Sequence, residues 1–280
     1  MNEELPRDSA WRGMATAVVR LMFMLALAWT TSPAQAGTIA DARLAGAGVE
    51  VTLDDVVISS TTDLIAGETV KNFHLQDATG GMCVFGPNAA VDQLLALAGE
   101  GDLVTITATT ASHQGLFELN LFDGPFSMVN NGYAGVPSAM PITLVDLQDY
   151  SPTAEALEST LTTLAGVSFL DAGGTFDGAT DYMVTDGVHN GWIRVSTYEQ
   201  DIVGTIIPGG TVDITGLVSQ WDDGNPPPGQ PGVGYCITPR DLADIVPEPA
   251  SLSLLTLGAL FVTRRRRQCR FVARRPSYQT

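Results

Sequence analysis

Two stretches of this chain repeat each other in order and spacing, and the repeat limits the possible folds more than any other feature. The segment Asn72-Phe-His-Leu-Gln-Asp77 returns 109 residues later as Asp181-Tyr-Met-Val-Thr-Asp186. A second segment, Gly101-Asp-Leu-Val-Thr-Ile-Thr107, returns 108 residues later as Gly209-Gly-Thr-Val-Asp-Ile-Thr215. Because the offset hardly changes between the two matches, chance explains them poorly. We therefore expect two copies of one small domain within the 280 residues.

Each copy is predicted to hold five short β-strands, with a helix between the third and the fourth. Apolar and polar residues alternate along the strands, as at Phe73 and Leu75, and glycine-containing turns separate them. The strands expected in the first copy are 49–58, 72–76, 82–85, 103–110 and 116–120, with a helix at 89–98. Those expected in the second are 159–170, 181–185, 192–196, 211–219 and 235–238, with a weaker helix pattern at 197–204. Short helical lead-ins are expected at 38–44 and 144–149.

Three strands, a helix and two further strands is the chain order of the OB-fold, a five-stranded Greek-key barrel. The chain resembles tandem OB-fold-like modules of secreted bacterial proteins, which implies a mainly β fold with two such barrels. The modules are expected at 37–125 and 143–246, joined by a linker at 126–142 that is rich in Gly, Pro and Asn. A proline-rich run at 222–232 is expected to form the loop between strands four and five of the second barrel, a position that shapes ligand sites in OB-folds.

The N-terminus has the pattern of a secretory signal. Three arginines precede a short apolar run at 21–29, which is predicted to be helical, and Ala34-Gln35-Ala36 fits the small-x-small rule for cleavage. Residues 1–36 are therefore predicted to be a signal peptide that engages the Sec translocon and signal peptidase, with cleavage after Ala36. The alternative is an N-terminal membrane anchor, although no apolar residues extend the run.

The C-terminus combines three features in a fixed order. Pro247-Glu248-Pro249 is followed by an apolar stretch at 250–263, and then by Arg264, Arg265, Arg266 and Arg267. This pattern closely resembles the PEP-CTERM sorting signal of bacterial surface proteins. The resemblance covers 247–267 and implies that an exosortase removes the apolar helix and the arginines. Before processing, the helix would contact the membrane with its arginines inside. A basic tail at 268–280 extends further than is usual for this signal.

Between these two signals the chain is strongly acidic. Residues 37–246 contain four basic residues and 27 acidic ones. Such a segment repels phosphate backbones, so nucleic acid is not an expected partner.

Catalytic candidates are few. His74, His113 and His189 show no zinc-binding spacing, and no Gly-x-Ser-x-Gly motif occurs. We therefore expect no enzyme activity, with a secreted hydrolase as a remaining alternative. Cys83 and Cys236 are expected to be buried thiols, or a disulfide in an oxidising compartment.

Two features could bind a ligand, and both belong to the second copy. Aromatic side chains on an OB surface can stack on a ligand, and the candidates here are Trp192, Arg194, Trp221 and Tyr235. Asp222 and Asp223 offer oxygen ligands for Ca²⁺, and no other cofactor is expected.

The sequence thus predicts a secreted, surface-sorted protein without catalytic activity. Its expected role is structural or interactive, in the envelope or the extracellular polysaccharide matrix. The alternative is a carbohydrate-binding module, calcium-dependent or not, with its site in the second copy.

Overall fold

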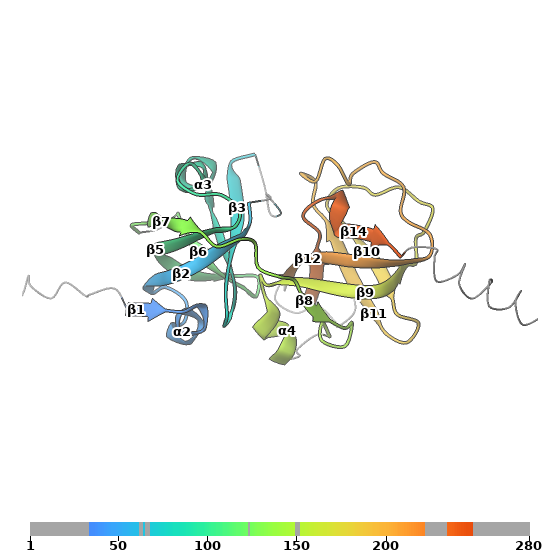
Figure 1. The fold of residues 1–280 in the computed structure, drawn as a ribbon, viewed down its shortest axis with the longest axis horizontal. Helices are drawn as coiled ribbons and strands as arrows, with labels where there is room; N and C mark the ends of the chain where they lie inside the picture. Colours follow the sequence, from blue (N-terminus) through green and yellow to red (C-terminus); the bar gives the residue numbers. More distant parts are fainter. Residues whose placement is uncertain are drawn as a thin grey trace, which may run out of the picture.

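The computed structural model describes residues 34–61, 64, 68–122, 124–148, 152–221 and 234–248. Two β-barrels follow one another along the chain and lie side by side (Figure 1). The predicted signal helix and the predicted C-terminal apolar helix lie outside the described residues. Among the residues that are described, no helix is long and apolar enough to cross a membrane.

The first barrel closes through five strands in the order β2-β3-β4-β6-β5, with β5 pairing back to β2. This is the OB-fold order, in which the third and fifth strands pair in parallel, as β4 and β6 do here. Its elements are β2 (Glu50–Ser60), β3 (Val70–Asp77), β4 (Gly80–Pro87), α3 (Asn88–Leu95), β5 (Asp102–His113) and β6 (Leu116–Asn120), preceded by α2 (Ile39–Ala45).

The second barrel repeats this topology in the order β9-β10-β11-β13-β12, closed between β12 and β9. Its strands are β9 (Leu161–Phe169), β10 (Thr180–Thr185), β11 (Asn190–Val195), β12 (Thr211–Trp221) and β13 (Gly234–Thr238). The helix expected at 197–204 is replaced by turns. Instead, α4 (Pro152–Leu157) precedes β9, and a short 3-10 helix, η1 (Leu242–Asp244), follows β13.

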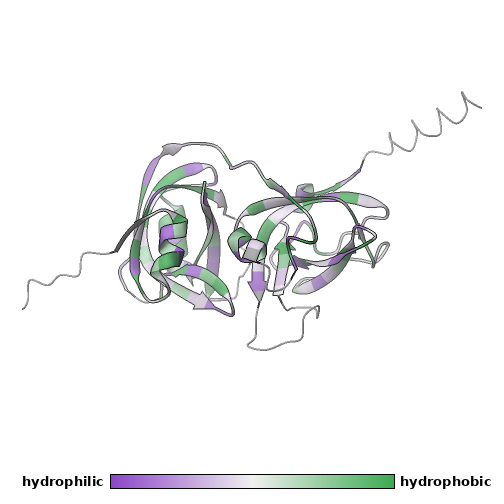
Figure 2. Ribbon diagram, turned by 90° about the horizontal axis from the view of Figure 1, so that it is seen from below, coloured by the Kyte–Doolittle hydropathy of each residue, from purple (hydrophilic) through white to green (hydrophobic). Residues whose placement is uncertain are grey.

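Apolar and polar residues alternate along the barrel strands (Figure 2), so each barrel fills its interior with every second side chain. In the first barrel Phe73, Leu75, Ile106 and Leu119 are fully buried. The second barrel has a separate core in which the ring of Phe176 packs edge-on against Phe169 and Tyr182. Two cores confirm the prediction of two barrels, because each module buries its own apolar face.

The segment expected to be a linker, 126–142, contains two strands, and the first of them covers an edge of β5 that β6 leaves open. β6 pairs with the second half of β5, and β7 (Ser127–Tyr133) covers the first half of the same edge. In the second barrel β14 (Ile245–Pro247) covers the first half of β12 in the same way. Two further strands, β1 (Ala34–Gly37) and β8 (Met140–Ile142), pair in parallel with β2 and β9. All four protect strand edges that would otherwise be open.

Candidate functional site

In OB-folds, ligands bind on the outer face of strands two and three and on the loops that flank it. In the first module this region comprises β3, β4, the β2–β3 loop and the β5–β6 turn. Its outward-facing side chains are nevertheless buried: His74 is 4% exposed and Cys83 is fully buried, and Glu118, which pairs with Cys83 from the neighbouring strand β6, is also 4% exposed. The second module makes contacts across this same region.

Those contacts come from α4 and from the ends of β9 and β12. The backbone N–H of Leu161 donates to Oε1 of Gln76 at 3.0 Å. Leu64, in the β2–β3 loop, packs against Leu161 and Leu217. With its amide nitrogen facing two acceptors, Gln220 donates to the Glu158 carboxylate and to the carbonyl oxygen of Gly115 in the β5–β6 turn. The face of the first barrel that corresponds to the ligand-binding face of OB-folds thus contacts the second module.

An ion pair with a buried carboxylate joins the two modules in this interface. Arg43 of α2 reaches Glu158 at 2.7 Å, and its other terminal nitrogen donates to the carbonyl oxygen of Gly81 at 3.0 Å. The guanidinium also lies over the ring of Phe117, 5.6 Å from its centroid. Burial raises the pKa of Glu158 to about 7, although the Arg43 charge acts to lower it.

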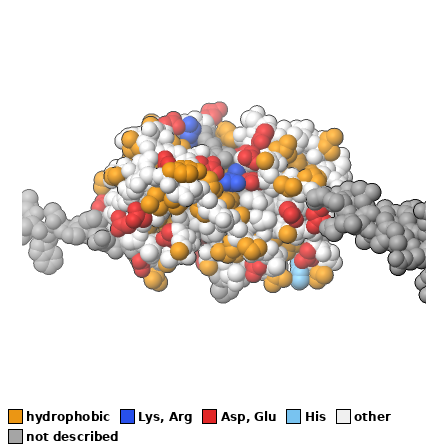
Figure 3. Space-filling view, viewed as in Figure 1, with side chains coloured by type: hydrophobic (Ala, Val, Ile, Leu, Met, Phe, Trp, Pro, Cys, Tyr) orange, Lys and Arg blue, Asp and Glu red, His pale blue; other side chains and the backbone are white. Residues whose placement is uncertain are grey.

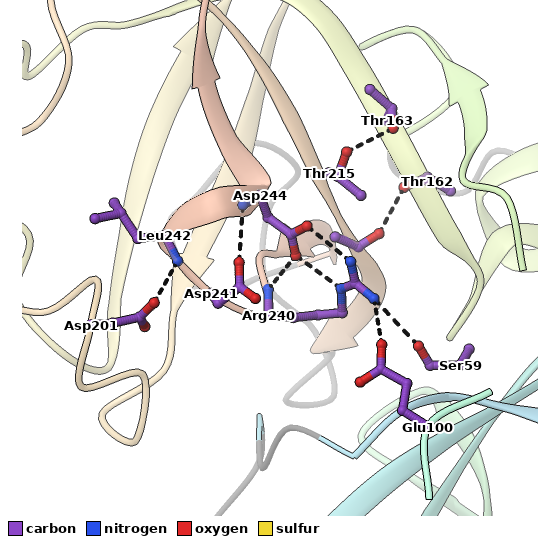
Figure 4. Close-up of polar contacts among 11 residues, drawn as sticks. Ser59, Glu100, Thr162, Thr163, Asp201, Thr215, Arg240, Asp241, Leu242 and Asp244 are labelled. Carbon is purple, nitrogen blue, oxygen red and sulfur yellow. Dashed lines mark hydrogen bonds and ion pairs between the residues drawn. The ribbon is translucent and has the colours of Figure 1, made fainter. Parts of the chain in front are cut away.

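A second ion pair joins the modules at another point (Figure 4). Arg240 donates to Glu100 of the first module at 3.0 Å, and Asp244 binds the same guanidinium at 2.9 and 3.0 Å. The Asp244 carboxylate, as the main cause, raises the pKa of Arg240. Arg43 and Arg240 are two of the four basic residues in 37–246, and both bridge the modules.

The equivalent face of the second module, on β10 and β11, is only partly buried. Trp192 pairs with Met183, and Arg194 pairs with Asp181, all on the outer side of the barrel. Arg194 donates to both carboxylate oxygens of Asp181, at 3.0 and 3.1 Å. Trp192 therefore stands beside a fixed guanidinium, which is the arrangement expected from alternation along the strand.

Tyr235 does not share this surface. It is 4% exposed and its hydroxyl donates to Glu155 at 2.6 Å, while burial raises its pKa. Its position in the strand turns it toward the core, so it is not available to a ligand on the β10–β11 face. The side chain of Trp221 and the residues Asp222 and Asp223 lie outside what the structure describes, so their ligand roles stay predictions.

The histidine candidates His74 and His189 and the repeated residues Asp77 and Asp186 have surroundings that point to roles in the fold. Burial lowers the pKa of His74 to about 3, so this imidazole is neutral at physiological pH. His189 is exposed and lies in a turn whose backbone N–H groups donate to Asp186, lowering the pKa of that carboxyl. Asp77 accepts comparable bonds from Thr79 and Gly80.

Cys83 and Cys236 are buried thiols that are not joined in a disulfide. Burial raises the pKa of Cys236 to about 12, which makes its thiolate inaccessible at neutral pH. Within the described ranges, no three His, Cys, Asp or Glu side chains are placed to share a metal ion.

Acidic groups are scattered over both barrels on the face drawn in Figure 3, with few basic ones among them. The other two basic residues of 37–246 also form ion pairs, Lys71 with Asp92 at 2.8 Å and Arg194 with Asp181. The surface therefore has little to attract a polyanion.

The predicted sorting residues lie at the end of the second barrel. Pro247 is the last residue of β14, and Glu248 follows it, both exposed. Pro249 and the four arginines lie outside the described residues. The backbone of Ala34 and Ala36, the predicted cleavage positions, belongs to β1, and cleavage there stays a prediction.

Sequence reasoning missed the interface residues Glu158, Gln220 and Arg240. The sequence did carry one signal for the β3 side of the interface. Three uncharged polar residues, Asn72, His74 and Gln76, lie on the face of the strand opposite Phe73. Their partners come from distant segments and follow no local pattern.

Comparison with known proteins identifies one motif and several distant folds. Residues 246–267 match the PEP-CTERM protein-sorting motif. No curated protein matches the chain. Similar solved structures include a murine DNA-binding protein bound to double-stranded DNA, with 14% identity over 68% of this chain and 92% of that chain and a TM-score of 0.34.

Two further structures are similar at the same low level. The Ifi202 HINa domain in complex with 20-bp double-stranded DNA has 12% identity over 69% of this chain and 92% of that chain, with a TM-score of 0.35. A replication protein A heterotrimer bound to single-stranded DNA has 15% identity over 59% of this chain and 39% of that chain, with a TM-score of 0.27. These likenesses are too weak to bear on function. Residues 246–267 carry the PEP-CTERM sorting motif, which implies secretion to the bacterial cell surface and exosortase processing, and the two five-stranded barrels fit OB-fold-like modules.

Proposed function

We propose that the two barrels form one rigid, non-catalytic unit with a structural or interaction role in the envelope or the extracellular polysaccharide matrix. The observation that supports this most is that the second module covers one face of the first barrel. Its strands two and three and both flanking loops contact the second module, so the surface with which an OB-fold binds a ligand here binds the rest of the chain.

The chemistry of the interface suits a fixed joint. Arg43–Glu158 and Arg240–Glu100 lie at separate points, and β7 and β8 bind the connecting segment to both barrels. A rigid, acidic, two-barrel body is suited to act as a spacer or an attachment point in a hydrated matrix.

A second candidate function is carbohydrate binding by the second module. It is favoured by Trp192, half-buried on the open β10–β11 face beside Arg194 and Asp181. An indole stacks on the apolar face of a sugar ring, while the paired guanidinium and carboxylate can hydrogen-bond to sugar hydroxyls. A neutral glycan also avoids repulsion by the acidic surface.

Co-sedimentation of the purified exported protein with the organism's extracellular polysaccharide separates the two candidates. The informative variant is Trp192→Ala, and the matched control is Tyr133→Ala, which removes an aromatic side chain that is 76% exposed on the first module. Retention lost only with Trp192→Ala supports the binding module. Retention that needs calcium would direct attention to Asp222 and Asp223.

Equal retention of all three proteins, or none, agrees with the structural role and contradicts a stacking site at Trp192. Release of reducing sugar ends during the incubation would contradict the absence of catalysis. If the retention result agrees with the structural role, cross-linking on intact cells would identify the protein partners.

A further inference from the structure

The matched sorting motif begins at residue 246, within strand β14 at the edge of the second barrel. After β13 and η1, strand β14 returns to β12 and pairs with it through three residue pairs. These are Ile214 with Ile245, Asp213 with Val246 and Val212 with Pro247. Pro247, the first residue of Pro-Glu-Pro, is therefore the last residue of β14, and no spacer separates the folded module from the motif.

The next residue of the motif is held as well. The backbone N–H of Glu248 donates to the carbonyl oxygen of Thr211 at 3.0 Å. In return, the hydroxyl of Thr211 donates to Oε2 of Glu248 at 2.8 Å. The carboxylate lies over Gly166 of β9, where a Cβ would come within 3.4 Å of its other oxygen. A single threonine thus binds both the backbone and the side chain of the central glutamate.

The bound segment is fixed at one end and weakly held at the other. Ile245 is 4% exposed, and the Asp244 carboxylate is clamped by Arg240. Val246, Pro247 and Glu248 are exposed, and their backbone is held by β12. Such a strand end opens locally at low cost without unfolding the barrel. Ile245 then acts as the point from which the last three described residues can leave.

An enzyme that cleaves a peptide chain binds it as an extended segment through main-chain hydrogen bonds. The N–H group of Glu248 is already used by Thr211, and one edge of the segment is occupied by β12. Cleavage of a folded substrate therefore follows the population of its locally opened form.

We propose that Thr211 and the adjoining edge of β12 form a latch that holds Pro247 and Glu248 closed, and that the exosortase acts on the state in which residues 246–248 have left β12. The latch makes processing sensitive to the folded second barrel. It also explains why a strand that protects the edge of β12 ends in the sorting motif. This inference rests on the motif and on β14, and is independent of the role proposed for the two barrels.

The test uses Thr211→Val in the full-length chain, expressed in the producing organism with its own exosortase. This variant removes the hydroxyl without changing any residue of the motif. Loss of one charge-assisted hydrogen bond at an exposed site raises the open population about five-fold. A pulse-chase measurement should therefore show the chain losing its C-terminal segment about five-fold faster. Thr211→Ser, which restores a hydroxyl, should return the rate toward that of the unchanged protein.

Thr215→Val is the matched control, because it removes a hydroxyl from the same strand, where Thr215 bonds to Thr163 at 2.9 Å and does not touch the motif. Its processing rate should not change. Hydrogen exchange of the Glu248 amide in the purified full-length chain gives a second readout, which should accelerate in Thr211→Val by the same factor as processing. Faster exchange with unchanged or slower processing would overturn the proposal, and so would unchanged exchange.

Discussion

The contact made by Gly81 provides a direct test of whether the two barrels form one body. A Cβ atom built on Gly81 would lie 2.2 Å from the carbonyl carbon of Ser159 and 2.4 Å from the backbone nitrogen of Thr160. Ordinary contacts of this kind are no shorter than about 3.4 Å, so the backbones must separate by about 1 Å. Gly81 has no positive φ, so alanine fits the strand itself and strains only the interface.

We expect Gly81→Ala to lower the free energy of unfolding by about 2–3 kcal/mol, the usual cost of overpacking between backbones that cannot repack by rotating a side chain. The shift also lengthens the bond from Arg43 to the carbonyl oxygen of Gly81, now 3.0 Å. For a body of this size the melting temperature should fall by about 5–10 °C.

Calorimetry and small-angle scattering on the exported protein check this prediction. The unchanged protein should melt in one transition, whereas Gly81→Ala should show two and a larger radius of gyration. The controls are Gly99→Ala and Gly209→Ala, because a Cβ at either position meets nothing within 4 Å. If Gly81→Ala melts and scatters as the controls do, the two modules do not dock through this face.

Three further substitutions test single contacts, each by urea unfolding. Burial raises the pKa of Glu118 to about 7, so the folded state keeps a proton that the unfolded chain releases above about pH 4.5, and stability falls as the pH rises from about 4.5 to 7. Glu118→Gln should match the unchanged protein near pH 4.5 and exceed it by about 1–3 kcal/mol at pH 8; a difference that ignores pH would contradict this. Arg43→Met leaves the Glu158 carboxylate buried without its cation and should cost about 3 kcal/mol at pH 8, and less at pH 5, where Glu158 is protonated; an equal loss at both pH values would show that the ion pair is not the cause. Phe176→Ala removes a fully buried ring between two others and should cost about 3–5 kcal/mol, against less than 1 kcal/mol if the second core were loosely packed.

The barrels could be predicted from the sequence because their strands carry a local signal. In β6 the expected range 116–120 is the observed one, and the strands of both copies differ from expectation by only a few residues at their ends. Alternation predicts a strand with one buried face, and that is the only pattern it can reveal. In β3 both faces are buried, Phe73 and Leu75 inside the barrel and His74 on its outer side. The sequence therefore predicted the burial of the inner face and missed the burial of the outer one.

The edge strands could not be predicted for a different reason. β7 contains Asn130, Asn131 and Gly132, and β14 ends in Pro247, which are residues typical of turns. These segments become strands because β5 and β12 each leave half of one edge unpaired. The free N–H and C=O groups of such an edge hydrogen-bond to an adjacent extended segment with little regard to its sequence. The interface was missed for the same reason, since Glu158 and Gln220 acquire their partners only when distant segments meet.

The two copies differ in how far the outer faces of their second and third strands are buried. Across the outer face of the first barrel, His74, Cys83 and Glu118 occupy one row of the sheet, and the matching row in the second barrel holds Met183, Trp192 and Cys236. The first row is buried within the chain, and its groups are uncharged over much of the pH range because burial shifts the pKa values of both His74 and Glu118 toward the neutral forms. The second row keeps a partly exposed tryptophan beside a guanidinium. In the second copy α4 lies between the lead-in turn and the first strand and contacts the first barrel, so the face of the first copy is covered within the chain while that of the second stays partly exposed.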